Sequence, residues 1–122
     1  MTESDPPRAF SELRDVHDFL AEVRKRPGMW LPGGSLQHLD FMIIGYQIAL
    51  QAHGLQEKDG GAFDFANFGP FPEWLWPRLG LGYPSALRWA VEIERAAEKQ
   101  GVPALTLFFD LLDEYAAERG EG

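Results

Sequence analysis

LQHLDFMIIGYQIALQAH, residues 36–53, is the stretch of this 122-residue chain that determines its fold class. Apolar residues occupy so much of the circumference of a helix here that the sequence predicts a central and largely buried helix. Ser35 is a suitable N-cap for it, and Gly54 is a suitable C-cap. The most apolar part, Phe41–Leu50, is interrupted by Gln47 and is shorter than the roughly 18 residues that a membrane-spanning helix needs.

The segment before this helix carries a second helical pattern. Apolar residues recur at helical spacing over about residues 11–24, and Pro27 ends the helix that they predict. The basic run at positions 24–26 stands at the C-terminal end of that helix, where positive charge complements the helix dipole. Residues 27–34 are rich in Pro and Gly and are predicted to form a loop.

The segment after the central helix is predicted to be an aromatic-rich loop. Residues 55–83 lose the helical periodicity, and Pro and Gly interrupt them repeatedly. A turn or two of helix is expected at 72–79, where Pro77 forbids a longer one. Two further helices are predicted, one at 85–100 that ends at Gly101 and one from Pro103 to about 119, and the short link between them should make them antiparallel neighbours.

Together these patterns predict an all-α fold. We expect a compact bundle of four main helices, a short helical segment and an aromatic-rich loop. This single helical domain would cover residues 11–119, after a flexible N-terminal tail at residues 1–10. The chain has no Cys and no segment that resembles an export or anchoring signal, so we expect a cytoplasmic protein.

The charge of the chain limits the classes of partner. Nineteen acidic residues stand against eleven basic ones, which gives a formal net charge of −8. Such a charge repels nucleic acid and anionic membranes, and it attracts a cationic partner. The composition therefore predicts a basic protein partner and neither nucleic acid nor membrane binding.

Residue types that carry catalysis or bind metals form no recognised motif. His17, His38 and His53 lack the spacing of metal ligands. Ser35 follows two glycines, but the sequence around it matches neither a nucleophile elbow nor a phosphate-binding loop. We therefore expect no catalytic residue, no metal site and no cofactor.

The last predicted helix carries a row of acidic residues whose spacing places them on one exposed face. Such a row is the ordinary solvated face of a helix, and it is also a docking surface for a basic partner. Because aromatic anchors ringed by charge are typical of interfaces, we expect exposed aromatic residues beside the row. The residues of this predicted binding site are Asp110, Asp113, Glu114, Glu118, Trp76 and Tyr83.

Residues 23–30, VRKRPGMW, resemble the V-R-K-R-P-G-M-Y-I-G segment near the start of type II topoisomerase ATPase subunits. That family also requires a magnesium-binding Asn, an Asp-x-Gly-x-Gly motif and a Gly-rich lid, and this sequence has none of them. The chain is also too short for the ATPase domain. The resemblance therefore does not imply ATP hydrolysis.

A broader resemblance spans most of the chain. The motifs that carry it are Arg26-Pro27-Gly28-Met29-Trp30-Leu31, Ser35-Leu36, Gly45-Tyr46, Phe71-Pro72-Glu73-Trp74-Leu75 and the run 107–115, LFFDLLDEY. They are similar to small uncharacterised bacterial proteins with an R-P-x-M-Y-L-G start and an F-F-x-L-x-D-E-[FY] end. Trp30 and Pro32 depart from the Tyr and Gly of that pattern. Some of these proteins resemble immunity proteins of polymorphic toxin systems, which implies binding and neutralisation of a cognate toxin.

The leading hypothesis is a non-enzymatic protein-binding module, an immunity-type inhibitor of a cationic protein. One alternative is a small-ligand pocket or an undetected enzyme site, formed where the aromatic loop 63–83 folds over the central helix near Tyr46 and His53. The other is a structural, self-associating protein with an aromatic homodimer contact. The residues of that contact would be Trp30, Trp74 and Trp76.

Overall fold

The computed structural model of the chain describes residues 13, 15–54, 70–82 and 86–118. The helices in these residues are α1 Val16–Lys25, α2 Pro27–Trp30, α3 Leu36–Ala52, α4 Pro70–Arg78, α5 Arg88–Gln100 and α6 Ala104–Glu118, with a 3₁₀ segment η2 at Pro32–Gly34. No strand occurs in the described part, and the all-α prediction is confirmed. The predicted tail 1–10 and most of the predicted aromatic loop, 55–69 and 83, lie outside the described residues.

The number of predicted helices was only approximate. α1, α3, α5 and α6 are the four main helices, and α4 is the expected short segment. The predicted loop at 27–34 instead contains α2 and η2. Leu31 lies between these two and is almost completely buried, so it anchors this Pro- and Gly-rich stretch to the core.

Local capping explains where several helices begin and end. Asp15 caps α1 with its side chain, and the hydroxyl of Ser35 accepts the N–H of His38 at 3.2 Å at the start of α3. Gly54 and Gly101 follow α3 and α5 with φ of +66° and +72°. Glycine adopts this left-handed conformation without steric cost, so both residues end their helices as the sequence predicted.

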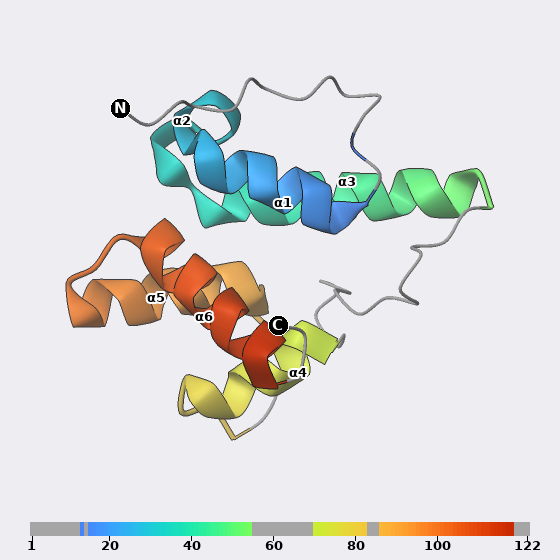
Figure 1. Ribbon diagram of the computed structural model, residues 1–122. Coiled ribbons are helices and arrows are strands. Elements are labelled where there is room, and N and C mark those ends of the chain that lie inside the picture. The colour runs from blue at the N-terminus through green and yellow to red at the C-terminus, as the bar shows by residue number, and fades with distance from the viewer. Residues whose placement is uncertain (1–12, 14, 55–69, 83–85, 119–122) are drawn as a thin grey trace.

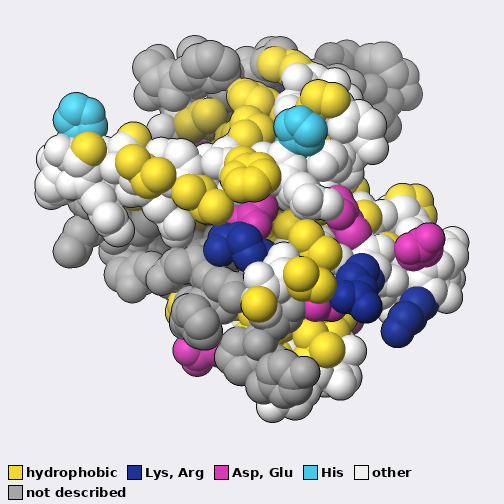
Figure 2. Space-filling model, turned by 180° about the vertical axis from the view of Figure 1, so that it is seen from behind, with side chains coloured by type: hydrophobic (Ala, Val, Ile, Leu, Met, Phe, Trp, Pro, Cys, Tyr) yellow, Lys and Arg dark blue, Asp and Glu magenta, His cyan; other side chains and the backbone are white. Residues whose placement is uncertain are grey.

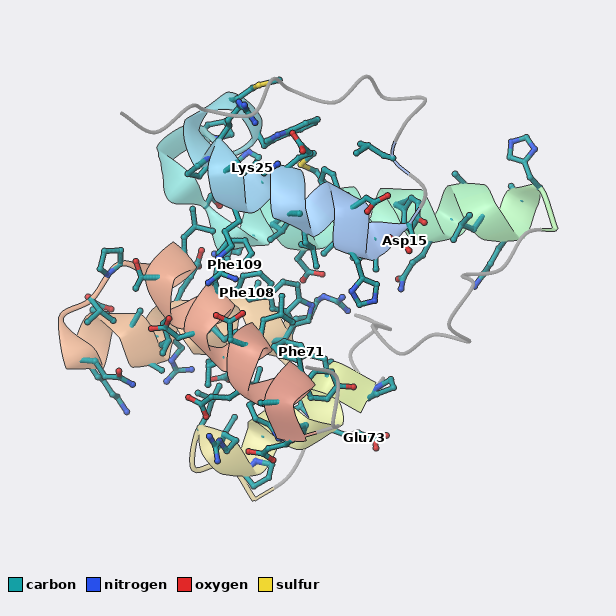
Figure 3. All side chains as sticks on the ribbon, viewed as in Figure 1. Asp15, Lys25, Phe71, Glu73, Phe108 and Phe109 are labelled. Atoms are coloured by element: carbon teal, nitrogen blue, oxygen red, sulfur yellow. The ribbon has the colours of Figure 1, made fainter. Side chains whose placement is uncertain are left out.

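The helices form two layers, with α1, α2 and α3 in one and α4, α5 and α6 in the other (Figure 1). α6 folds back against α5 after their short link, so the two are neighbours as expected, although α6 crosses α5 obliquely and is not strictly antiparallel to it; α3 also packs on α5. Aromatic residues fill much of the core: the rings of Phe71 and Phe108 lie 6.1 Å apart, and Trp89 stacks on Phe108 at 5.3 Å (Figure 3). The same core cluster includes Leu20 of α1 and Leu39 of α3, so the core joins both layers.

Polar contacts fix α3 on α5. Arg88 donates two hydrogen bonds to the buried carboxylate of Asp40, at 2.7 and 2.9 Å. The carboxylate of Glu94 accepts the backbone N–H of Leu36 at 3.0 Å and a side-chain hydrogen bond from Gln37 at 2.8 Å. Glu94 thus places negative charge at the N-terminus of α3, where the helix dipole favours it.

The prediction that α3 is largely buried is wrong for its second half, and for Phe41 in its first half. Its buried residues all lie between Leu36 and Ile43. Phe41 and Ile48 are 68% and 62% exposed, and Figure 1 shows the C-terminal half of α3 extending beyond the other helices. An apolar helix is buried only where another element covers it, and α5 meets α3 along its first half.

Candidate functional site

The acidic row predicted from the sequence lies on the outer side of α6. The residues that α6 buries are Phe108, Phe109, Leu111 and Tyr115. The opposite side is exposed and carries Asp110, Asp113, Glu114 and Glu118. The structure therefore brings these four predicted residues together on one surface, which we call the α6 acidic row.

Asp113 in this row is bound by a basic residue of α1. Arg24 donates from Nη1 and Nη2 to the two carboxylate oxygens at 2.9 and 2.8 Å. This hydrogen-bonded pair lowers the pKa of Asp113, although partial burial opposes the shift. Asp113 remains about half exposed, so its carboxylate both joins the two layers and faces solvent.

The C-terminal end of the row is bound by α4. Arg78 forms ion pairs with Glu114 and Glu118, and its guanidinium lies 5.0 Å from the centre of the Trp74 ring. The indole N–H of Trp74 donates to Glu118 at 2.9 Å. The sequence did not reveal these contacts, because nothing in the spacing of Arg24 or Arg78 indicates which helix each will meet.

Asp110 differs from the other three acidic residues. Within the described part of the chain, no hydrogen bond or ion pair engages its carboxylate. The pKa of Arg24 is raised mainly by its hydrogen bond to Asp113, and the nearby charge of Asp110 makes a smaller contribution. It also lines an open groove of about 280 Å³ between α6 and the end of α1. The other residues that line the groove are Arg24, Pro27, Leu105, Thr106 and Phe109.

The predicted aromatic anchors do not accompany the acidic row. Trp76 is only 4% exposed, because α4 turns it toward the core together with Phe71, Pro72 and Leu75. Its placement as an exposed binding residue is therefore wrong. Tyr83 lies outside the described residues. Two other aromatic residues lie beside the row: Trp74 binds Glu118, and Phe109 lines the groove together with Asp110.

The tryptophans proposed for a homodimer contact are used inside the molecule. The ring of Trp30 meets Phe19 edge-on at 5.4 Å. Trp74 packs between Phe71 and Tyr115, at 6.0 and 5.4 Å. With Trp76 also buried, these three residues do not form the exposed aromatic surface that this alternative required.

The predicted pocket in the aromatic loop is described only in part. Residues 70–82 contain α4, which packs on α6, while 63–69 and 83 lie outside the described residues. The groove beside Asp110 is formed by other elements. It is therefore a different site from the pocket that the sequence suggested near Tyr46 and His53.

The basic run at positions 24–26 is engaged by acidic side chains. Lys25 and Arg26 form ion pairs with Glu22 at 3.6 and 3.4 Å, and Arg24 binds Asp113. Glu22 is buried, so its charge needs these neighbours. The run therefore has structural partners as well as a favourable position at the end of α1.

The described residues contain no cluster of three or more His, Asp or Glu side chains placed to hold a metal ion. None of the described helices has the length and hydropathy required to cross a membrane.

Comparison of the chain with protein-family models, with curated proteins and with solved structures found no match.

Proposed function

We propose that the protein is a non-enzymatic binding module that docks a basic protein partner on the exposed side of α6. The observation that carries this proposal is the position of Asp110. Its carboxylate has no ion pair among the described residues, and it lies at the edge of a groove whose lining includes Phe109 and Leu105. A partner that carries an apolar side chain next to a Lys or Arg would fill the groove with the apolar side chain and pair with Asp110 through the basic one.

The groove would supply the anchor of this interface. Interfaces gain most of their binding energy from a few well-packed side chains that are removed from water, and charged groups at the rim add specificity. Pro27, Leu105 and Phe109 offer apolar surface, while Asp110 lies beside them. The guanidinium of Arg24 already lies over the Phe109 ring, 5.1 Å from its centre. A basic side chain of the partner would therefore bind the carboxylate of Asp110 instead of the Phe109 ring.

The rest of the α6 acidic row supports this role through its rigidity and charge. Arg24 and Arg78 hold Asp113, Glu114 and Glu118 in defined positions. These carboxylates remain 45–58% exposed, and a carboxylate bound by one arginine still has lone pairs for further donors. The net charge of −8 would attract a basic partner over a longer range.

The class of partner that we propose is a toxin with a basic surface, met in the cytoplasm. The run 107–115 lies within α6 and carries part of the resemblance to small bacterial proteins, some of which resemble immunity proteins. An immunity-type inhibitor needs a preformed surface that matches one partner. The groove and the α6 acidic row would be such a surface.

Capture from an extract of the producing cells, followed by mass spectrometry, tests the proposal. The baits are the unmodified protein, Asp110→Lys and a matched charge reversal, Glu73→Lys. Glu73 is exposed on α4, and Figure 3 shows it well away from Phe109, which lies near the centre of the molecule. We expect a basic protein that the unmodified chain and Glu73→Lys retain and that Asp110→Lys loses. Equal retention by all three baits, or capture of no basic protein, would contradict the proposal.

A further inference from the structure

The outer face of α3 carries large apolar side chains that none of the described elements covers. Phe41 and Ile48, two helical turns apart, are 68% and 62% exposed. Gly45, Ala49 and Ala52 are exposed between and beyond them on the same side of the helix. Figure 2 shows hydrophobic side chains following one another along this helix. Large exposed apolar patches mark interaction surfaces.

This face is also uncharged, in a chain that is strongly acidic elsewhere. The sequence of α3 contains no Lys, Arg or Glu, and its one Asp is Asp40. Asp40 directly precedes Phe41 and lies about a quarter-turn around the helix from the exposed row, where it is buried and neutralised by Arg88. Two copies of a chain with a net charge of −8 repel each other, so a face without charge is where they can meet most readily.

The presence of glycine at position 45 independently indicates that this face of α3 is a contact surface. It lies in the middle of a 17-residue helix, where glycine is less favourable than alanine because it loses more conformational freedom on folding. A Cβ atom added at Gly45 would meet nothing within 4 Å among the described residues. Its φ is not in the left-handed region, unlike that of Gly54. Nothing in the described fold requires glycine here, whereas close approach of a second backbone would.

We propose that the outer face of α3 binds the same face of a second copy, with the two helices antiparallel about a two-fold axis near Gly45. In a two-fold contact, a residue i of one copy that touches residue j of the other implies that residue j of the first copy also touches residue i of the second. Gly45 lies near the midpoint between Phe41 and Ile48, so Phe41 of one copy would pack beside Ile48 of the other, and the reverse. The small residue at the centre would let the helices approach.

This contact is separate from the proposed function, because it uses α3 and leaves the α6 acidic row exposed. It also has the opposite salt dependence. Association through an uncharged face of two acidic chains should strengthen as salt screens their repulsion, whereas docking of a basic partner should weaken. One of the two proposals can therefore fail without the other.

Sedimentation of the full chain over a range of concentrations tests the proposal. One helix face is smaller than the roughly 800 Å² per partner of a standard stable interface, so we expect a weak dimer with a Kd of about 10–100 μM. Ile48→Glu would place two negative charges in the contact and should raise the Kd at least tenfold. Val102→Glu is the matched control, since Val102 is also an exposed apolar residue, 38% accessible, but lies in the α5–α6 link.

The Gly45→Leu variant tests whether the dimer can be weakened without destabilising the folded monomer. Leucine favours the helix more than glycine does, and the open space at Gly45 accepts the side chain, so the monomer should be at least as stable as before. Its dimer should weaken at least tenfold because the backbones can no longer approach. A wild-type chain that stays monomeric at 1 mM would overturn the proposal, as would a dimer that persists in Ile48→Glu and Gly45→Leu or one that Val102→Glu disrupts equally.

Discussion

Arg24 and Asp113 are 89 positions apart in the chain and meet through two hydrogen bonds of 2.9 and 2.8 Å. The pair joins α1 in one layer to α6 in the other. It also means that an acidic residue expected to face a partner already has a partner inside the molecule. The structural and the binding roles of the α6 acidic row can therefore be separated residue by residue.

Replacing Asp113 with Asn should lower the free energy of unfolding modestly. The side chains of Arg24 and Asp113 are 50% and 58% exposed, and solvent screens such a pair, so we expect a loss of about 0.5 kcal/mol at neutral pH. Urea unfolding would measure it. Asp110→Asn is the control, because no described ion pair is lost there, and an equal loss in both variants would contradict the structural role of the Arg24 pair.

The contribution of Asp113 should also depend on pH. The hydrogen bond from Arg24 lowers the pKa of Asp113 below its ordinary value of 3.8. The folded chain therefore holds this proton less tightly than the unfolded chain, so the stabilisation is present above pH 3.8 and disappears as the pH falls through the lowered pKa. Unfolding curves of wild type and Asp113→Asn should converge in acid. A difference that stays constant at all pH values would show that the charge of Asp113 is not involved.

Replacing Arg88 with glycine should destabilise the fold less than replacing it with alanine. Its φ is +78°, where residues with a Cβ atom are strained by about 1–2 kcal/mol. Both Arg88→Ala and Arg88→Gly remove the partner of the buried Asp40, and each should cost about 2 kcal/mol for that reason. The glycine variant should nevertheless be about 1 kcal/mol more stable than the alanine variant. The reverse order in urea unfolding would mean that the backbone at Arg88 relaxes in solution.

A single cysteine at Gly45 should link two copies covalently. The chain contains no Cys, so Gly45→Cys would introduce the only thiol. Near a two-fold axis the two Cα atoms would fall within the roughly 7 Å that a disulfide can span. Mild oxidation should yield a linked dimer of Gly45→Cys much faster than of Val102→Cys, as judged by non-reducing electrophoresis. Equal rates of linkage would contradict the antiparallel arrangement.

Local sequence signals predicted most of the fold. The positions of α3, α5 and α6 followed from apolar periodicity, and Ser35, Gly54 and Gly101 marked helix ends because capping depends on residues close in sequence. Burial was harder to predict. The second half of α3 has the apolar character of a core helix, yet its exposure depends on how far α5 extends along it, and periodicity carries no such information.

The candidate site was predicted only in part. The spacing of the α6 acidic row correctly placed four carboxylates on one exposed face. The side of α4 that faces the core could not be read from its Pro-rich sequence, and Trp76 was therefore assigned to the surface. Arg24 and Arg78 reach the row through tertiary structure, so sequence spacing alone could not distinguish the engaged Asp113 from Asp110.

The most direct test of the proposed function is the association rate of the captured basic partner with the unmodified protein, Asp110→Lys and Glu73→Lys. The rates should be compared between about 0.01 M and 0.15 M salt, where the screening length falls from about 30 Å to about 8 Å. If Asp110 guides the partner to the groove, Asp110→Lys should associate at least about tenfold more slowly at low salt and depend less on salt, while Glu73→Lys should stay close to wild type. Equal rates for Asp110→Lys and Glu73→Lys across this range would show that the partner does not dock at Asp110.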